Sequence, residues 1–516
     1  MSFLRPTRLP AVLAWLLGLV VVATAAPTIP AYDVRTYGAK GDGTTVNTKA
    51  INAAIEAAAS AGGGTVYFPP GTYLSGSIRL KSNLTLYLEA GSVIEAANEK
   101  VTTFDPPEPN EWGERLHYQD FAHSHWQNSL IWGIGLQNVS ILGPGLIHGK
   151  GLDSGFDRFA TGPAGDKRYR ANPEGCGNKA IALRDCRNVV LRDFSILHGG
   201  WFGILMTAVD NLTIDNLKID TNRDGMDIDA CQNVRITNTS VNSPWDDGIC
   251  LKASYGLGRL KHCDNITISN CFLAGSFDEG TLLDATFKRS EPAYKSYGTG
   301  RIKLGTESNG DFKNITITNC VFDGSRGIAL ESVDGSHIED VAISNVTMRH
   351  VQNCPIFIRL GARMRGPEGT PVGSIKRVSI NNLVVSDADW TLGNVISGLP
   401  GHPIEDIRFS NIRISFQGGG SQELAKRVPP ENEIFYPEPS MFGEMPSYGF
   451  FFRHVSGIEL HDVKLDYLNP EARPAVVLDD VQDATFHHVN FRHGTANAPL
   501  FESRGNVTGL SVTDSR

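Results

Sequence analysis

The chain has 516 residues, 41% of them hydrophobic, and its 47 basic and 56 acidic residues give a net charge of −9. An acidic protein is a poor candidate for binding nucleic acid, because phosphate contacts require a basic surface. Beyond residue 26 no stretch is apolar enough to span a membrane. We therefore expect neither nucleic acid nor a membrane as a partner.

Residues 1–25 have the pattern of a signal peptide. Arg5 and Arg8 precede an apolar run from Ala11 to Ala26, and the small residues of "ATAAP" suit signal peptidase. The run is too short to persist as a membrane-spanning helix. We expect cleavage near residue 25 and export to the periplasm or the extracellular space.

Residues 30–100 are predicted to form an N-terminal cap and the first strands. The alanine-rich stretch 48–61 is predicted to be a helix that Asn47 or Thr48 caps and that "GGG" terminates. The following "TVYFPPGTYL" has the alternation of strands. If strands stack into coils from here on, this helix would cover their open end, which otherwise exposes apolar side chains and unpaired backbone groups.

A short alternating strand preceded by a turn-forming residue recurs from residue 138 onward. It begins at Asn138, Asn188, Asn211, Asn233, Asn265, Asn314, Asp340, Arg377 and Asp406, with weaker copies at Gly457 and Asp483. The repeat is roughly 22 to 26 residues, with insertions, and no helix lies between copies, which favours a parallel β-helix. Leucine-rich repeats are the competing interpretation, but their leucine-asparagine signature is absent. We predict an all-β fold, a single right-handed parallel β-helix with an N-terminal capping helix, in which residues 101–516 carry a catalytic groove.

Several repeat asparagines belong to Asn-x-Ser/Thr triplets, which allow two interpretations. They could be glycosylated, or each could occupy a left-handed turn where its amide stacks on those of neighbouring coils. We favour the structural interpretation. Cys271 and Cys320 fall at the same place in two copies, which favours buried stacking positions over a disulfide framework.

Two segments lack any period, residues 99–129 and 418–447, and both are predicted to be long loops, the first of which could wall a binding groove. Another, Phe287–Thr299, could block one end of a groove and favour attack on chain ends.

Acidic residues recur at one position of successive repeats. Asp224, Asp246 and Asp278 each lie 13 residues after a repeat asparagine, and Asp247 and Glu279 follow the last two directly. Stacking would bring them together, and crowded carboxylates repel one another, which raises the pKa of at least one. A protonated acid beside an ionised one suits glycosidic hydrolysis. A calcium site, or Asp-Gly turns without function, remain open alternatives.

These motifs resemble glycoside hydrolase family 28, the polygalacturonase-like enzymes. The "YGAKGDG…GGGTVYFPPGTY" start looks like the pectin-degrading β-helix superfamily, Asn222 and Asp224 match the family's Asn-Thr-Asp element, and Asp246 and Asp247 match its Asp-Asp pair. The resemblance implies that Asp246 is the proton donor, that Asp224 and Asp247 hold the water as base, and that the anomeric carbon inverts.

Two departures separate the chain from that pattern. The histidine of the family's Gly-His-Gly element is replaced near "YGTGRIKLGTES", and the cations of its Arg-Ile-Lys element are replaced by Ala329 and Glu331. Arg301 and Lys303 in "RIK" stand one coil too early, so we interpret that match as coincidental in position. The "GTESNG" and "PIFIRLGAR" segments look like a bacterial branch of the family described as acting on rhamnogalacturonan-type pectin.

Further residues are candidates for binding substrate. Arg301, Lys303, Arg359 and Arg363 could hold a uronate carboxylate or could be ordinary surface cations. Lys252 could bind substrate or tune the acids, and Glu307 and Glu331 could replace a lost family function. Trp245, Trp201, Trp112 and Trp126 could stack on sugars or be buried in loop packing.

We predict an exported glycoside hydrolase that cleaves α-linked, galacturonate-containing pectic poly- or oligosaccharides, with no metal or organic cofactor and with a monomer expected. Two rival interpretations are a calcium-dependent polysaccharide lyase on the same scaffold and a non-catalytic carbohydrate-binding β-helix.

Overall fold

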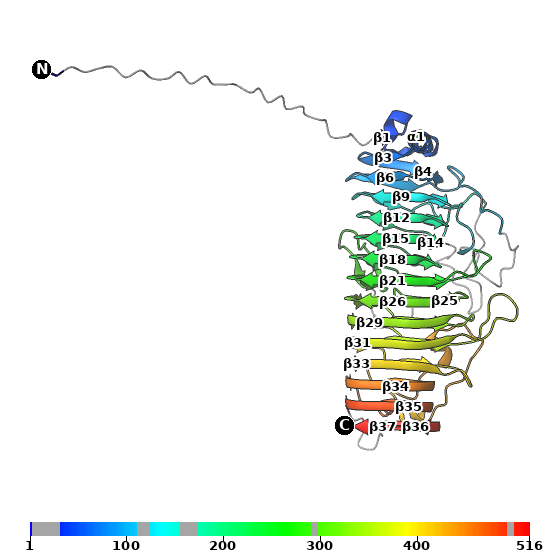
Figure 1. Cartoon of the computed structure of the whole chain (residues 1–516), viewed down its shortest axis with the longest axis vertical. Coiled ribbons are helices and arrows are strands. Elements are labelled where there is room, and N and C mark those ends of the chain that lie inside the picture. Colours follow the sequence, from blue (N-terminus) through cyan, green and yellow to red (C-terminus); the bar gives the residue numbers. More distant parts are fainter. Residues whose placement is uncertain (3–30, 111–122, 155–173, 290–297, 493–499) are drawn as a thin grey trace.

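The computed structural model describes residues 1–2, 31–110, 123–154, 174–289, 298–492 and 500–516. Residues 3–25 of the predicted signal peptide and Trp112 lie outside the described residues. Most of the described chain winds into one 35-stranded sheet whose coils are stacked in sequence order along the long axis (Figure 1). The prediction of a right-handed parallel β-helix is confirmed.

Each coil contributes strands to rows that run along the stack, and the rows pair in parallel. The first row is β1 (Ala31–Asp33), β3 (Gly64–Phe68), β6 (Leu84–Leu88), β9 (Gln137–Leu142), β12 (Arg187–Arg192), β15 (Asp210–Asp215), β18 (Gln232–Thr237), β21 (Cys263–Ser269), β26 (Phe312–Thr318), β29 (His337–Arg349), β31 (Ser374–Ala388) and β33 (Ile404–Phe416). The second row is β2 (Asp42–Val46), β4 (Gly71–Ser75), β7 (Ser92–Ala96), β10 (Leu146–His148), β13 (Ser195–Leu197), β16 (Lys218–Asp220), β19 (Ser240–Asn242), β22 (Phe272–Ala274) and β27 (Val321–Asp323), and it continues into β29.

The third row carries most of the candidate site residues. It is β5 (Ile78–Arg79), β8 (Ile131–Ile134), β11 (Lys179–Arg184), β14 (Phe202–Thr207), β17 (Asp224–Asp229), β20 (Ile249–Ala253), β25 (Ile302–Ser308), β28 (Ile328–Ser332), β30 (Ile356–Leu360) and β32 (Asn394–Ser397). In the last coils, the long strands β34 (Phe450–Tyr467) and β35 (Val476–Phe491) span more than one row, and β36 (Phe501–Thr508) and β37 (Ser511–Thr513) end the stack.

Inward-facing aliphatic residues at the same register build the core. Val189 pairs with Leu212, Leu212 with Val234, Val234 with Ile266 and Ile266 with Ile315, and all five are buried. Because strand residues alternate between the two faces, the intervening polar residues point outward. The period-two pattern of the repeat is therefore the signature of the core.

The repeat asparagines form a ladder along one edge of the first row. Asn138, Asn188 and Asn211 have φ of 57–58°, and each donates its side-chain amide to the asparagine of the preceding coil at 2.8–2.9 Å. Asn265 and Asn314 continue the pattern, with amide bonds of 3.2 and 2.6 Å. The structural interpretation of these asparagines is confirmed.

Helix α1 (Thr48–Ser60) covers the first coil, with Ile51, Ala54, Ile55 and Ala58 buried against it. Asn47 stands at the N-cap but makes no capping hydrogen bond, which corrects that part of the prediction: its side chain binds the backbone of Lys40 and Thr45 instead. The Thr48 hydroxyl accepts from Gly76 N at 2.7 Å and so ties the helix to the next turn.

The other elements lie outside the rows. They are η1 (Val34–Tyr37), the hairpin β23 (Phe277–Glu279) and β24 (Lys288–Arg289), α2 (Gln422–Ala425) and η3 (Pro439–Phe442). All eight cysteines are buried and unbridged, so the stacking interpretation of Cys271 and Cys320 is confirmed. Among the described helices none has the length and apolarity that crossing a membrane would need.

Candidate active site

Three aspartates meet where two neighbouring coils turn into the third row. Asp224 begins β17, and Asp246 and Asp247 lie in the turn before β20. Gly225 N donates to Asp247 O at 2.9 Å, which holds the two turns directly against each other. Carboxylate oxygens of Asp224, Asp246 and Asp247 all lie within 4.8 Å of one another. The predicted clustering of these three acids is confirmed.

The glycine of the Asp-Gly step permits this close stacking. A Cβ on Gly225 would lie 2.5 Å from Gly248 O and 2.4 Å from the Val241 side chain, so a larger residue would push the coils apart. The pattern that resembled a simple turn signal therefore also sets the distance between the carboxylates.

Three cations contact two of these three acids. Arg223 Nη2 lies 3.2 Å from Asp246 Oδ2, Arg301 Nε donates to Asp247 Oδ1 at 2.7 Å, and Lys303 Nζ lies 2.7 Å from Asp247 Oδ2. The Asp246 side chain is 28% exposed, whereas Asp224 and Asp247 are buried. Asp246 is thus the member of the cluster that a substrate can reach most easily.

The surroundings give the buried pair opposite titration behaviour. Burial raises the pKa of Asp224 well above its usual value, and the negative charges of Asp227 and Asp246 raise it further. Burial alone would also raise the pKa of Asp247, but the charges of Arg301 and Lys303 outweigh it and hold that pKa below its usual value. The cluster therefore combines a carboxyl that keeps its proton with one that is ionised.

The prediction that Asp278 and Glu279 form a third rung of the acid cluster is wrong. Asp278 and Glu279 belong to β23, which pairs antiparallel with β24 outside the main sheet. Residues 275–299 are an insertion, and the coil resumes at Gly300, whose N–H donates to Asp246 O at 2.8 Å. A count along the chain cannot follow the stack across such an insertion.

The insertion also determines the rung on which "RIK" lies. Arg301 and Lys303 are on the rung directly after Asp247, because Cys250 of β20 pairs with Lys303 of β25. Both side chains are buried, so they are not solvated surface cations. Both bind Asp247, one rung before Ala329.

The site of the missing family cations is packed with a loop. Ala329 pairs with Lys303 in register and lies in an apolar cluster with Phe442 and Met445. We call residues 427–445 the covering segment; they belong to the predicted loop 418–447. A long cation at position 329 would compete for the space that this segment fills.

Glu331 is fully buried beneath the covering segment rather than exposed to a substrate. The Thr306 hydroxyl donates to its Oε2 at 3.1 Å, and Arg301 lies 3.9 Å away. Burial raises the pKa of Glu331 to about 7, although Lys303 and Arg301 oppose the shift.

Lys252 and Glu307 belong to a second, buried row of alternating charge. Lys252 Nζ lies 2.9 Å from Glu307 Oε2 and 3.9 Å from Asp227 Oδ2, and His123 Nε2 lies 3.0 Å from Asp227. Arg363 extends the row from Glu307, at 3.7 Å, to Asp334, at 2.5 Å. The charge of Asp227 raises the pKa of Asp224, and the charge of Lys252 lowers it. Lys252 therefore fits the predicted tuning role better than direct contact with substrate.

Arg359 does not reach the aspartates with its charged group. Its guanidinium is buried and donates to Ser397 Oγ and to the carbonyls of Gly398 and Glu431. The expectation that it binds substrate is not supported by these contacts, because its donors hold the covering segment in place.

The tryptophans and Asn222 have different surroundings. Trp245 and Asn222 are half-buried, and Trp245 N donates to Asn222 O at 3.1 Å, next to Asp246. Trp201 is half-buried with the Arg223 guanidinium 4.4 Å from its ring centroid. Trp126 is buried and donates from Nε1 to Thr207 Oγ1, so the loop-packing alternative holds for it.

The sequence reasoning missed three residues that contact the cluster or its partners. Arg223 stands between Asn222 and Asp224, so its position in the motif was a usable signal. Asp227 lies three residues after Asp224 in the same strand, β17, so its closeness along the chain was a usable signal. Glu438 gave no signal, because it reaches Arg301 and Arg326 from a loop more than a hundred residues later.

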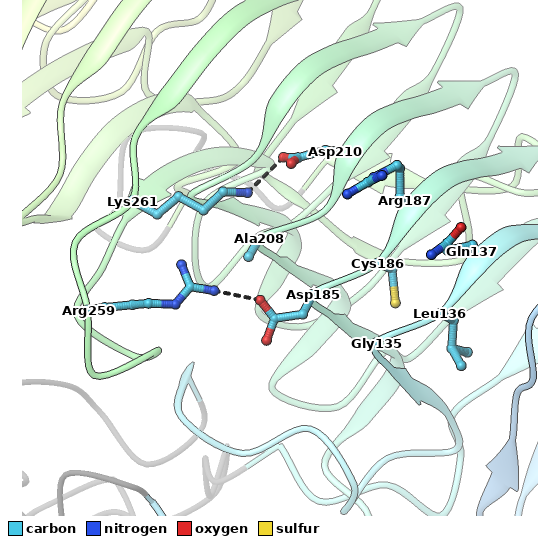
Figure 2. A pocket seen from close by; sticks show the side chains of 10 residues that line it. All are labelled: Gly135, Leu136, Gln137, Asp185, Cys186, Arg187, Ala208, Asp210, Arg259 and Lys261. Atoms are coloured by element: carbon cyan, nitrogen blue, oxygen red, sulfur yellow. Dashed lines mark hydrogen bonds and ion pairs between the residues drawn. The ribbon is translucent and has the colours of Figure 1, made fainter.

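A pocket of about 190 Å³ lies elsewhere, at the turns that join the third row to the first (Figure 2). Arg259 binds Asp185 at 2.8 Å and Lys261 binds Asp210 at 2.7 Å across it. None of the predicted site residues lines this pocket, and these two cations are already paired with acids. The aspartate cluster remains the better candidate for a catalytic site.

The fold and the cluster together define a β-helix protein with a carboxylate site suited to polysaccharide chemistry. A family model for right-handed β-helix regions matches residues 171–290, and one described as rhamnogalacturonase A/epimerase, pectate lyase-like, matches residues 31–115. The chain is 25% identical over 270 residues to an exo-poly-alpha-D-galacturonosidase of Dickeya chrysanthemi, covering 45% of this chain and 43% of that protein. It is 24% identical over 412 residues to a probable polygalacturonase of Vitis vinifera, covering 76% of this chain and 75% of that one.

Among solved structures, the fold is similar to that of an exopolygalacturonase from Thermotoga maritima. The TM-score is 0.59 at 19% identity, over 76% of this chain and 89% of that one. The chain is therefore similar in sequence to polygalacturonases and in fold to an exopolygalacturonase. The chain spans less than half the length of the Dickeya protein that it matches.

Proposed function

We propose that this protein hydrolyses α-glycosidic bonds of a galacturonate-containing pectic polysaccharide or oligosaccharide. The observation that carries the proposal is the cluster of Asp224, Asp246 and Asp247, with carboxylate oxygens within 4.8 Å and one member open to solvent. The printed names of the relatives, polygalacturonase and exo-poly-alpha-D-galacturonosidase, support the choice of substrate class.

The three carboxyl groups divide the chemistry. Asp246 gives a proton to the glycosidic oxygen as the bond to the anomeric carbon breaks, and the leaving sugar departs with a new hydroxyl. Asp224 and Asp247 hold the attacking water. As the water oxygen bonds to the anomeric carbon, the ionised carboxylate of Asp247 takes the proton that the water loses. Exposure supports Asp246 as the donor, and the lowered pKa of Asp247 supports its role as a base.

We propose inversion at the anomeric carbon on the basis of the family resemblance. An inverting pair is typically separated by about 6.5–9.5 Å, which exceeds the spacing within this cluster. The proposal therefore places the water beside the Asp224–Asp247 pair rather than between donor and base. Proton NMR of the first product decides: the β-anomer from an α-linked substrate is expected, and an initial α-anomer would show retention.

The residues beside the aspartate cluster fit contacts to an anionic sugar chain. Arg301 and Lys303 supply positive charge beside Asp247, which favours an anionic uronate nearby. Trp245 and Asn222 flank Asp246 and would contact the sugar on the donor side. Within the pectic class we propose a rhamnogalacturonan-type substrate, supported by the family model that matches residues 31–115.

The decisive experiment combines a substrate panel with one variant and a matched control. Purified protein is incubated with polygalacturonan, rhamnogalacturonan and their oligosaccharides, and the products are identified by mass. Asp246→Asn is expected to remain folded and to lose at least a thousandfold in kcat, because the proton donor is gone. Asp210→Asn, which removes an acid of the pocket in Figure 2, is expected to keep full activity. Substantial turnover by Asp246→Asn would rule out its role.

A calcium-dependent lyase is the main rival. Arg223, Arg301 and Lys303 already contact the acids that a calcium ion would need, and their charge opposes a bound cation. Hydrolysis is therefore expected to continue in excess chelator without an ultraviolet-absorbing product. Activity that chelator abolishes would favour the lyase.

We also propose export, supported by the arginines and apolar run of residues 1–26. Expression of the full chain followed by N-terminal sequencing of the released protein is expected to give a start near residue 26. An intact N-terminus in the cytoplasm would contradict it.

A further inference from the structure

The covering segment presents three consecutive apolar residues to solvent. Ile434 is 70% exposed, Phe435 56% and Tyr436 50%. Such residues are costly to leave in water unless they bind something, and aromatic rings pair well with the apolar faces of sugars. Tyr436 differs from its two neighbours because it also contacts residues of the site.

Tyr436 lies next to the cations of the aspartate cluster. Lys303 Nζ is 5.9 Å from its ring centroid, and this same ammonium group is 2.7 Å from Asp247 Oδ2. The Arg363 guanidinium is also 5.9 Å from the ring. A single lysine head group therefore separates the ring from a carboxylate that acts on the substrate.

The ring is held by fixed groups on both the site and the loop. The Tyr436 and Thr306 hydroxyls are hydrogen bonded to each other at 3.0 Å. Two residues later, Glu438 binds Arg301 and Arg326. Upstream, Arg453 and Arg359 donate to the carbonyls of Pro429 and Glu431 at 2.8 Å.

These anchors matter for binding energy. A ring that is already ordered before the ligand arrives loses little conformational freedom on binding, so more of the contact energy appears as affinity. Buried arginines hold the backbone of the covering segment, and Tyr436 is half exposed within it, so the ring is both ordered and accessible to a ligand.

We propose that Tyr436 forms an aromatic subsite for a sugar ring of the substrate, on the side of the aspartate cluster toward the C-terminal coils. The proposal rests on the proposed function and adds a specificity-determining residue to it. The occupant is a pyranose ring of the anionic chain, stacked on Tyr436 with its carboxylate toward Lys303 and Arg363.

The test compares three variants in kinetics on the substrate that the wild-type protein hydrolyses. Tyr436→Ala is expected to raise KM about tenfold with kcat changed less than twofold, as the loss of one stacking contact predicts. Tyr436→Phe keeps the ring and loses only the bond to Thr306, so a KM within about twofold of wild type is expected. Phe435→Ala, the exposed neighbour, is the matched control, also expected within about twofold.

Binding is measured separately in the Asp246→Asn background by titration with a trimer of α-1,4-linked galacturonate. The same order of affinities is expected there, without turnover. Equal losses in Tyr436→Ala and Tyr436→Phe would show that the hydroxyl only fixes Thr306, and equal losses in Tyr436→Ala and Phe435→Ala would show a general effect of the loop. Either result overturns the proposal.

The two failures are distinguishable. Wild-type protein that neither binds the trimer nor hydrolyses any of the pectic substrates overturns the proposed function, and this inference with it. Wild-type turnover that Tyr436→Ala leaves unchanged in both KM and kcat overturns the inference alone.

Discussion

Lys303 and Arg301 show how single residues set the chemistry of the cluster. Both are buried, and both are bound to the carboxylate of Asp247. A buried carboxylate without such partners would take up a proton, because desolvation penalises its charged form. In the proposed mechanism their first role is therefore to keep Asp247 ionised, and any contact with a uronate is additional.

Removing Lys303 is expected to move the acidic limb of the pH–rate profile. In Lys303→Met the pKa of Asp247 rises, since burial is then opposed mainly by Arg301. The base becomes ionised only at higher pH, so activity at low pH falls at least tenfold and recovers as the pH increases. Lys313→Met, which removes a half-exposed lysine paired with Asp311, serves as control. An unchanged limb would contradict the role of Lys303.

The second row of charges makes a stability prediction at the same scale. Lys252→Met leaves Glu307 and Asp227 buried without their shared cation, and breaking a buried ion pair typically costs about 3–5 kcal/mol. Urea unfolding measures the loss. Lys252→Met with Glu307→Gln is expected to recover part of it, because fewer uncompensated charges remain; a double variant that loses the full sum would count against coupling of the pair.

At the scale of elements, the asparagine ladder joins one strand start to the next. Each rung combines a left-handed backbone conformation with an amide bond to the neighbouring coil, as at Asn211. The two contributions can be separated, because glycine adopts the left-handed region freely while β-branched residues do not.

Asn211→Gly is expected to cost about 1 kcal/mol, the value of the hydrogen bond to Asn188. Asn211→Val loses that bond and must also adopt φ near 57°, which adds roughly 1–2 kcal/mol. Urea denaturation at neutral pH should therefore order the variants as wild type, glycine, valine. Equal stability of the two variants would mean that backbone strain contributes nothing at this turn.

At the scale of the whole molecule, buried acids make stability depend on pH in two directions. The folded-state pKa values of Asp224 and Glu331 are raised, so their protonated forms stabilise the fold at low pH and that stability is lost as the pH rises through the raised value. Asp247 and Glu307 have lowered pKa values, so their contribution is present above their unfolded-state value near 4 and is lost as the pH falls.

Glu331→Gln is expected to weaken the decline of the free energy of unfolding between pH 4.5 and 7.5. The pKa of Glu331 rises from 4.5 to about 7 on folding, so the wild-type protein should lose roughly 3 kcal/mol between pH 4.5 and 7.5 through this residue. Free energies of unfolding measured in urea across that range should decline more steeply for wild type than for the glutamine variant. Parallel curves would show that Glu331 does not titrate there.

Much of the fold was predictable from the chain. The repeat asparagines and alternating aliphatics each act on their nearest neighbours, so strand positions, the left-handed turns and the capping helix follow from local patterns. The pairing of Asp224 with Asp246 and Asp247 was predictable for the same reason, because no insertion separates the two coils.

Tertiary structure alone decided the rest. Asp278 and Glu279 lie in β23, outside the stack, so Arg301 and Lys303 take the rung after Asp247. The covering segment reaches the same rung from more than a hundred residues away. By itself the sequence determined the repeating unit, because that depends on neighbouring residues. Which charges stand beside the aspartate cluster depends on where loops of irregular length pack, and only packing across the coils determines that.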